Sequence, residues 1–295
     1  MNDKKHVQEI NVTPTDYGLR ADIFIASNNP QFTRATLAKL FDGVHVLVNG
    51  QSVKHGYKLR AGDRIKLDTS PLESIPVTVN IPVIYENNDV VVMDKPAGML
   101  THSKGSFNAE ATVASFLATK ITDPHLAGNR AGIVHRLDRV TSGVIIGAKN
   151  SATQTWLQKQ FSSRKVKKTY LAVVEGVPEP KIATIDAPIG RNPKYPQTFI
   201  VTPLGRPAQT EYKILKTVSI DGKNKSLVEL KPTTGRTHQL RVHMAYIRHP
   251  IVGDSVYGHQ GQHMMLHAYK LELTIPGGQR KVFSAPTPES FKGLV

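Results

Sequence analysis

The 295-residue chain contains no cysteine. Disulfide bonds, thiolate metal sites and a cysteine nucleophile are therefore excluded, and the composition fits a reducing compartment. Long apolar segments are also missing: the N-terminal MNDKKHVQEI is polar, and no run approaches the roughly 18 residues that a membrane helix needs. We therefore expect a soluble, cytoplasmic protein with no membrane partner.

Acidic residues are scarce relative to basic ones. Asp and Glu number 23 against 38 Lys and Arg, which gives a formal net charge of +15. Clustered Lys and Arg gain free energy by displacing counterions from phosphates, so a balance this basic favours a nucleic acid as partner. Simple solubility or attraction to an anionic membrane would also account for the excess.

The motifs of metal and nucleotide sites are missing as well. None of the 12 histidines stands in an H-E-x-x-H arrangement, and no group of acids is spaced to hold magnesium. The stretches GSFNAEAT and TGRTHQ lack the Walker spacing, and Ser142 lies in TSG rather than in a G-x-S-x-G elbow. We expect no catalytic metal, no cofactor and no serine hydrolase.

The length is comfortable for two domains. The polar residues 1–13 are expected to form a flexible tail. Residues 14–70 predict a small α+β domain, in which LRADIFIAS and TRATLAKLF have helical spacing and Asn49-Gly50 supplies the turn of a hairpin. Three prolines and few charges mark residues 71–82 as a linker.

Residues 83–295 predict a larger, mostly β domain. Short β-branched runs such as VIYENNDVVVMDKPAG, GVIIGAK and TYLAVVEG are separated by Gly, Pro and Asn turns. Helical stretches are expected near 110–120, 151–161 and 237–248. The mixture indicates a mixed domain of catalytic size.

One carboxylate, Asp138, lies between two arginines in the apolar stretch GIVHRLDRVTSG. Residues 131–148 predict a strand, a loop and a second strand, and a loop held between buried strands is a usual place for a catalytic group. A partly buried carboxylate needs a cationic partner to stay ionised. In TTGRTHQLRVHMAYI, Arg241 flanks the apolar face of a predicted helix, so we predict an ion pair between Arg241 and Asp138.

Four motifs in their order along the chain make the sequence similar to the RluA-type pseudouridine synthase family: DKPAGMLTH, HRLDRVTSG, KKTYLAVVEG and GRTHQLRVHM. The resemblance continues through HPIVGDSVYG and LHAYKLEL. It implies an α+β catalytic domain, mostly antiparallel with flanking helices, that isomerises uridine in RNA without metal or cofactor. Many members have Asp where Val140 stands here, so activity is expected and substrate choice stays open.

The resemblance also implies roles for the catalytic residues. Asp138 matches the family's aspartate, a nucleophile that attacks either the base or the ribose carbon, and Arg241 matches the arginine that pairs with it. Tyr170 matches the tyrosine whose ring stacks on the target base. The base must leave its stack before attack, and Arg136 is suited to filling the vacated space or to holding phosphates.

Other basic residues near these motifs are candidates for RNA contacts. Arg236 is expected to meet phosphate beside the site, and the run SSRKVKK leads directly into Tyr170. His135 either contacts RNA or hydrogen-bonds its own loop. Lys95 is a further substrate contact, or it supports the floor of the site, or it is an ordinary lysine at the end of a strand.

The small domain resembles an RNA-binding module of a small-subunit ribosomal protein, on its TR-opened helix pair and its VLVNG hairpin. The resemblance implies that Arg34, Lys39 and Lys54 contact phosphates, which position a protein without reading sequence. It favours large-subunit ribosomal RNA as the substrate, with transfer RNA second and no DNA. Two other classes are weighed against it: a catalytically silent RNA-binding or ribosome-assembly protein, and a hydrolase, for which the motifs offer no second carboxylate. A monomer is the default.

Overall fold

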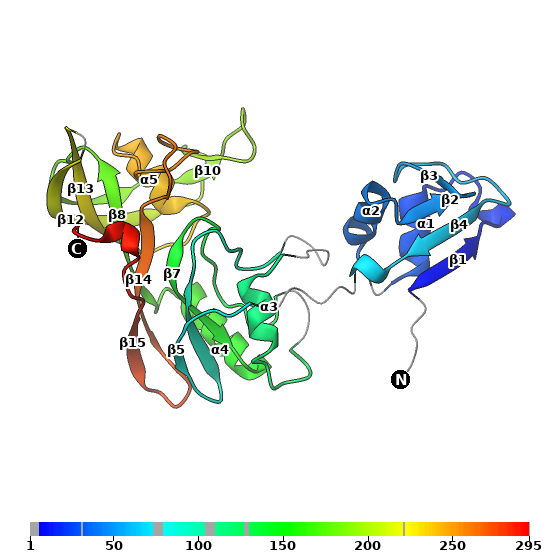
Figure 1. Cartoon of the computed structure of the whole chain (residues 1–295), viewed down its shortest axis with the longest axis horizontal. Coiled ribbons are helices and arrows are strands. Elements are labelled where there is room, and N and C mark those ends of the chain that lie inside the picture. The colour runs from blue at the N-terminus through cyan, green and yellow to red at the C-terminus, as the bar shows by residue number, and fades with distance from the viewer. Residues whose placement is uncertain are drawn as a thin grey trace. The chain divides into compact units, whose positions relative to one another are not determined.

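The computed structural model describes residues 6–30, 32–72, 79–103, 110–126, 130–220 and 222–294. The chain forms two compact units (Figure 1). The first consists of Met1–Thr78 and Ser103–Ala111, and the second consists of Val79–His102 and Thr112–Val295. Each unit buries hydrophobic clusters of its own, as expected of separate domains.

The first unit is an antiparallel four-stranded sheet with two helices. Its elements are β1 (Val7–Asn11), η1 (Pro14–Asp16), α1 (Ala21–Asn28), α2 (Arg34–Asp42), β2 (Val46–Val48), β3 (Gln51–Ser52), β4 (Arg64–Asp68) and η2 (Ser70–Leu72), and the strand order is β1-β4-β2-β3. Thr33 caps α2 by accepting a hydrogen bond from the backbone N–H of Thr36. Asn49 and Gly50 both have positive φ, which confirms the hairpin predicted there.

The expectation of a flexible tail over residues 1–13 is wrong for β1. Val7–Asn11 pairs with every residue of β4, and Val12 directly after it is buried. Residues 1–5, and residues 73–78 of the expected linker, lie outside the described part of the chain. The second unit begins at Val79 rather than at residue 83, because the side chain of Ile81 is already in its core.

The second unit is built on a nine-stranded sheet. Its strands are β5 (Val83–Glu86), β6 (Val90–Lys95), β7 (Ser142–Ala148), β8 (Lys167–Glu175), β9 (Ile182–Asp186), β12 (Gln209–Ile220), β13 (Lys223–Pro232), β14 (Leu266–Thr274) and β15 (Arg280–Ser284). The order is β5-β6-β7-β14-β8-β13-β12-β9, with β15 paired to β14. A separate hairpin joins β10 (Ile189–Arg191) to β11 (Phe199–Val201), and the helices are α3 (Val113–Ala118), α4 (Ser151–Ser162), α5 (Gln239–Tyr246) and η3 (Glu289–Phe291).

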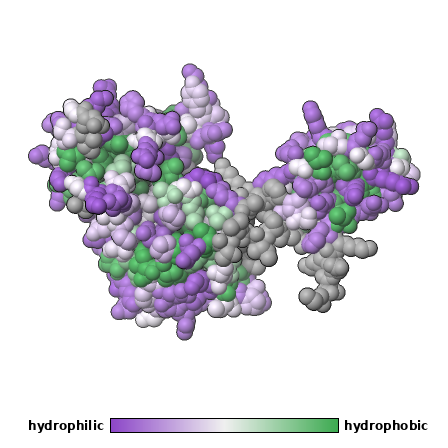
Figure 2. All heavy atoms as spheres, viewed as in Figure 1, coloured by the Kyte–Doolittle hydropathy of each residue, from purple (hydrophilic) through white to green (hydrophobic). Residues whose placement is uncertain are grey.

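This architecture confirms the predicted α+β class with a mostly antiparallel sheet. Among the described strands, only β7 and β14 pair in parallel. The three expected helices are present, each shorter than or close to its predicted span. Hydrophilic and hydrophobic residues are interspersed over the visible face of both units (Figure 2). No helix in the described part of the chain is long and apolar enough to cross a membrane.

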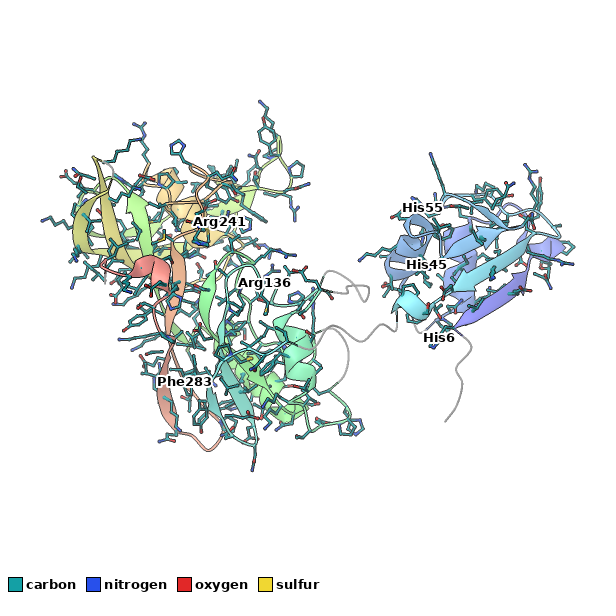
Figure 3. All side chains as sticks on the ribbon, in the orientation of Figure 1. His6, His45, His55, Arg136, Arg241 and Phe283 are labelled. Carbon is teal, nitrogen blue, oxygen red and sulfur yellow. The ribbon has the colours of Figure 1, made fainter. Side chains whose placement is uncertain are left out.

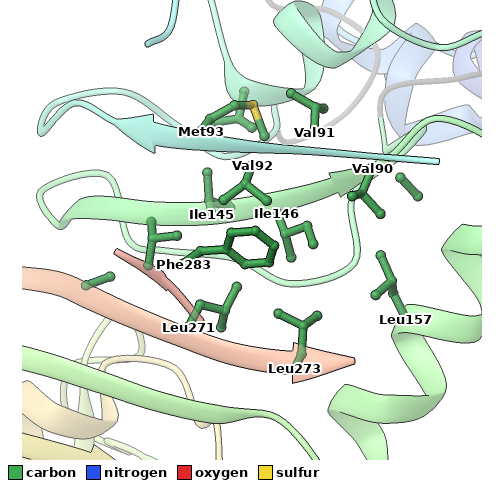
Figure 4. Packing of buried hydrophobic residues seen from close by; sticks show 14 of the residues in the cluster. Val90, Val91, Val92, Met93, Ile145, Ile146, Leu157, Leu271, Leu273 and Phe283 are labelled. Carbon is green, nitrogen blue, oxygen red and sulfur yellow. The ribbon is translucent and has the colours of Figure 1, made fainter. Parts of the chain in front are cut away.

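Strand β6 is buried on both faces. Its residues Val90, Val91, Val92 and Met93 are all fully inaccessible, which is why the sequence there reads as a continuous apolar run rather than an alternating one. Figure 4 shows their neighbours from β7, α4, β14 and β15. The loop that follows β6 and the loop that precedes β7 are therefore both attached directly to a buried part of the sheet.

The parallel pairing of β7 with β14 fixes where the loop before β7 ends. Gly143 lies against Ala268, and a Cβ at residue 143 would stand 2.2 Å from the carbonyl oxygen of Ala268. Its φ of 111° also requires glycine. The first strand predicted within residues 131–148 is not formed: Ile133 makes only an isolated bridge to Gly147. Residues 135–141 thus form a loop that leads into β7, and Asp138 lies in the middle of that loop.

Candidate active site

A cavity of about 550 Å³ opens beside this loop. Its walls come from the loop around Asp138, the end of α4, the start of β8, and residues 232–241 before and within α5. Of the described residues that line it, five are Arg or Lys and only Asp138 is acidic; two of the basic ones, Arg136 and Arg241, are labelled in Figure 3. A cationic cavity of this size suits part of a polyanion.

The backbone on both sides of Asp138 is clamped. Thr101 Oγ1 donates to the carbonyl of Leu137 at 2.8 Å and accepts from the N–H of Leu137 at 3.1 Å. Lys95 Nζ donates to the carbonyl of Arg139 at 3.3 Å and to those of Pro96 and Met99 at 2.9 Å each. Because the backbone on both sides of it is held, the Asp138 side chain has little conformational freedom to lose when it reacts.

Arg241 is the central cation of the site. Its Nε and Nη2 each donate to a carboxylate oxygen of Asp254 at 2.7 Å, and its Nη1 lies 3.8 Å from Oδ2 of Asp138. The side chains of Arg241 and Asp254 are buried, whereas that of Asp138 is 21 % exposed. The predicted Arg241–Asp138 pair is therefore present at ion-pair distance, but the hydrogen bonds of Arg241 go to Asp254.

Burial and charge act in opposite directions on this pair. Burial pulls down the pKa of Arg241, but its hydrogen bonds to Asp254 raise it above the usual value. Burial likewise works to raise the pKa of Asp254, yet the Arg241 guanidinium and two backbone N–H groups hold it below 3.8. Both groups stay charged around neutral pH, and Asp254 supports Arg241 from behind.

Tyr170 lies on β8, between its neighbours Leu230 on β13 and Ala268 on β14, and its half-buried ring lines the cavity. Burial, aided by the charge of Asp138, raises the pKa of its hydroxyl, so the ring stays a neutral phenol. A neutral aromatic face beside a carboxylate is a surface on which a planar base can stack.

Residues 89–246 match the family described as RNA pseudouridylate synthase. The chain belongs to this family. A protein of Aquifex aeolicus described as an uncharacterized RNA pseudouridine synthase is 37 % identical and covers 93 % of this chain and 92 % of its own. Ribosomal large subunit pseudouridine synthase D of Borreliella burgdorferi is 35 % identical, with coverage of 95 % and 89 %.

A solved structure supports the same conclusion. Human RNA pseudouridylate synthase domain containing 1 is 29 % identical and matches with a TM-score of 0.58 over 71 % of this chain and 84 % of its own. The protein is thus an RNA pseudouridine synthase, an isomerase whose substrate is RNA. The predicted family is confirmed.

The structure brings most of the expected site residues of this synthase together. Asp138, Tyr170, Arg241, Arg136 and Arg236 all line one cavity. From the run SSRKVKK, alternate residues line it as well, including Arg164 and Lys168. Lys168 Nζ donates to the carbonyl of Thr234 at 2.9 Å, and burial lowers its pKa to about 8.

For His135, the structure shows a hydrogen bond that joins its loop to β7, and contact with RNA stays a prediction. Its Nε2 accepts a hydrogen bond from the N–H of Ile146, and its ring stacks on Phe161 at 4.5 Å. Burial, with the nearby charge of Lys168, lowers its pKa to about 3. His135 is therefore a neutral hydrogen-bond acceptor that ties the Asp138 loop to β7, and it also lines the cavity.

Lys95 does not lie where an RNA contact would need it. The whole residue is buried, its ammonium donates to three carbonyls, and it is absent from the cavity wall. Burial lowers its pKa to about 8. The expectation of a substrate contact is wrong for Lys95, and the alternative of a support beneath the site agrees with the structure.

The three residues expected to contact phosphate, Arg34, Lys39 and Lys54, belong to the first unit. Arg34 is exposed, and its Nη2 donates to Oδ2 of Asp22 at 2.8 Å. The guanidinium of Arg20, joined by that of Arg34, holds the pKa of Asp22 far below its usual value. Lys54 is exposed and Lys39 is half-buried on α2. Their contact with RNA stays a prediction.

Three residues of the site were missed by the sequence analysis: Asp254, His238 and Tyr257. Asp254 is a second carboxylate, but its oxygens already accept from Arg241, Val256 N–H and Tyr257 N–H, so they are not free to act as a general base. The stretch HPIVGDSVYG contains two of the three and was noted only as part of the resemblance. No three His, Asp or Glu side chains converge as a metal site among the described residues.

Variants of Arg136 and of Lys95 should respond differently when RNA affinity is measured at several salt concentrations. We expect Arg136→Ala to weaken RNA binding and to reduce the slope of log K against log salt by about 1, because an exposed guanidinium at the cavity releases one counterion. Lys95→Met should leave the slope unchanged and lower the unfolding free energy by about 1 to 3 kcal/mol, since three carbonyls lose a donor. Filter-binding titrations at several salt concentrations check both, and a changed slope for Lys95→Met would place its ammonium on RNA.

Proposed function

We propose that this synthase isomerises uridines of large-subunit ribosomal RNA, with Asp138 as the nucleophile. The observation that supports the nucleophile is its placement: one partly exposed carboxylate in a cationic cavity, in a clamped loop, with Arg241 at 3.8 Å and the Tyr170 ring in the same wall. The choice of RNA is supported by relatives from three further bacteria whose names specify the large ribosomal subunit and which are 33–37 % identical.

In the proposed reaction, residues from different walls of the cavity have different roles. A uridine turned out of its stack enters with its base against Tyr170 and its ribose toward Asp138, while Arg136 meets the space or phosphates left behind. Asp138 attacks either the base or the ribose carbon, and desolvation together with Arg241 keeps the carboxylate oriented for it. The C1′–N1 bond breaks, C1′ bonds to C5, the C5 hydrogen leaves as a proton and N1 gains one.

The first unit is proposed to increase affinity for the same RNA. Arg34 and Lys54 are exposed cations on an α+β module with a tight hairpin, and Lys39 lies on the same helix as Arg34. Contacts of this kind position the enzyme on structured RNA and carry no sequence information. Specific recognition of the uridine then belongs to the cavity of the second unit.

Tritium release from transcripts labelled at C5 of uridine tests the substrate class. We expect release from large-subunit ribosomal RNA and little from transfer RNA, because formation of the C1′–C5 bond must expel the C5 hydrogen. Release from transfer RNA alone would replace the proposed substrate. Release from neither RNA would overturn the proposed substrate and point to another RNA.

A further inference from the structure

His238 occupies an unusual backbone position beside the nucleophile. It is the N-cap of α5 and has φ 56° and ψ 19°, the left-handed region that residues other than glycine, asparagine and aspartate seldom adopt. The next residue, Gln239, is buried and uses its side-chain amide to bond Thr234, Thr210 and the N–H of Arg236. This network holds the strained turn in place, and strain kept at a site is a reason to look for a role.

The imidazole of His238 is fixed at one nitrogen and aimed at Asp138 with the other. Its Nδ1 lies 2.8 Å from the Tyr257 hydroxyl, and its Nε2 lies 3.9 Å from Oδ2 of Asp138. The ring of Phe199 meets it edge-on at 5.7 Å. The side chain is 21 % exposed, so its direction is set by protein contacts and not by solvent.

The hydrogen bonds of Tyr257 favour one tautomer of His238. The backbone N–H of Phe199 donates to the Tyr257 hydroxyl oxygen at 3.0 Å, so the hydroxyl hydrogen is available for Nδ1 of His238. A neutral imidazole whose Nδ1 accepts must carry its hydrogen on Nε2, which is the atom that faces Asp138. Burial lowers the pKa of His238 against the opposing charge of Asp138, which agrees with a neutral ring.

Two donors therefore approach the same oxygen of Asp138. Arg241 Nη1 and His238 Nε2 lie 3.8 Å and 3.9 Å from Oδ2. No ion pair or hydrogen bond to Oδ1 is found among the described residues. Both distances are longer than hydrogen bonds, as contacts in a substrate-free site often are before the complex tightens them. The arrangement divides the carboxylate into one held oxygen and one free oxygen.

We propose that His238 is a positioning residue for the nucleophile: Tyr257 fixes its tautomer, and its Nε2–H holds Oδ2 of Asp138 so that Oδ1 faces the uridine. This inference rests on the proposed nucleophilic role of Asp138. Tyr257 is itself held by Phe199 and by Arg241, whose guanidinium carbon lies 5.0 Å from the centre of the Tyr257 ring. The orientation of the Asp138 carboxylate is thus set jointly by β11, α5 and the loop that contains Asp254.

The test is steady-state tritium release by three single variants and one double variant of the full-length enzyme. His238→Asn suits the left-handed backbone but removes the Nε2 group, and we expect kcat to fall about 10- to 100-fold with KM changed less than about threefold. His238→Gln places an amide N–H near the former Nε2 and should recover part of the loss. For Tyr257→Phe, kcat should fall about tenfold. In the double variant with His238→Asn, kcat should fall no further than in His238→Asn alone.

Two controls separate this effect from general damage. His249 also uses Nδ1 in a 2.7 Å contact, to the carbonyl of Glu175, so His249→Asn makes the same exchange away from the cavity and should leave kcat unchanged. The fluorescence of Trp156, the chain's single tryptophan, reports whether each variant remains folded. If His238→Asn does not fold, His238→Gln and Tyr257→Phe still decide the question.

The proposal is overturned if His238→Asn keeps kcat within about twofold of wild type, if the loss is in KM alone, or if the losses of His238→Asn and Tyr257→Phe add. Inactivity of Asp138→Asn beside a fully active His238→Asn would remove only the positioning role. Activity of Asp138→Asn would instead remove the nucleophile, and with it the basis of the inference.

Discussion

Asp138→Asn is expected to lower the rate of tritium release by at least about 1,000-fold, because an amide cannot replace a carboxylate nucleophile. The exchange preserves the shape of the side chain, and the clamps on the loop act on its backbone through Thr101 and Lys95. RNA affinity should therefore change little. Single-turnover release with saturating enzyme, together with filter binding of the same transcript, measures both quantities.

A matched exchange controls for the loss of one negative charge. Asp186 lies exposed on β9 and accepts a long side-chain hydrogen bond from Gln209, at 3.3 Å, so Asp186→Asn should keep full activity. Asp138→Asn that retained more than about one tenth of the wild-type rate would exclude Asp138 as the nucleophile. Loss of activity together with loss of binding would indicate damage to the cavity. The role of the carboxylate would then be tested with Asp138→Glu, which restores the charge.

Much of the catalytic domain could be predicted because its signals are local. The continuous apolar run at Val90–Met93 indicates a strand buried on both faces. The spacing around Arg241 predicts a helix, and α5 forms there, although all of Gln239–Met244 are buried and not one face alone. The family resemblance rests on four short motifs; three of them contribute residues to the cavity wall, and DKPAGMLTH holds the Asp138 loop through Lys95 and Thr101. Local pattern and final structure agree where the residues of a motif are neighbours in space.

The failures concern contacts between segments far apart in the chain. β1 is short and polar, and its pairing partner β4 begins more than fifty residues later, so nothing near Val7–Asn11 identifies it as a strand. Asp254 follows Arg241 by thirteen residues and reaches it through an irregular loop. The strand expected before the Asp138 loop has suitable residues, but only Ile133 reaches a partner.

Asp254→Asn is expected to lower the unfolding free energy of the second unit by about 3 to 5 kcal/mol, because it leaves the buried charge of Arg241 without its hydrogen-bonded carboxylate. Arg241 should then shift toward Asp138, the other described carboxylate within 4 Å, and kcat should fall about 10- to 100-fold. Urea unfolding followed by Trp156 fluorescence measures the stability of this unit alone, since its only tryptophan lies on α4.

The pH dependence distinguishes a lost ion pair from a packing defect. The folded pKa of Asp254 lies below its ordinary value of 3.8, so the stability that this group contributes is present above about pH 4 and is lost as the pH falls through the folded pKa. The difference between wild type and Asp254→Asn should therefore be constant near neutral pH and shrink below pH 4. Glu272→Gln is the control: its pair with Arg280 has the same 2.7 Å distance but is solvent-exposed, so its loss should matter little. A difference for Asp254→Asn that persisted undiminished into acid would mean that shape, and not charge, is what Asp254 supplies to Arg241.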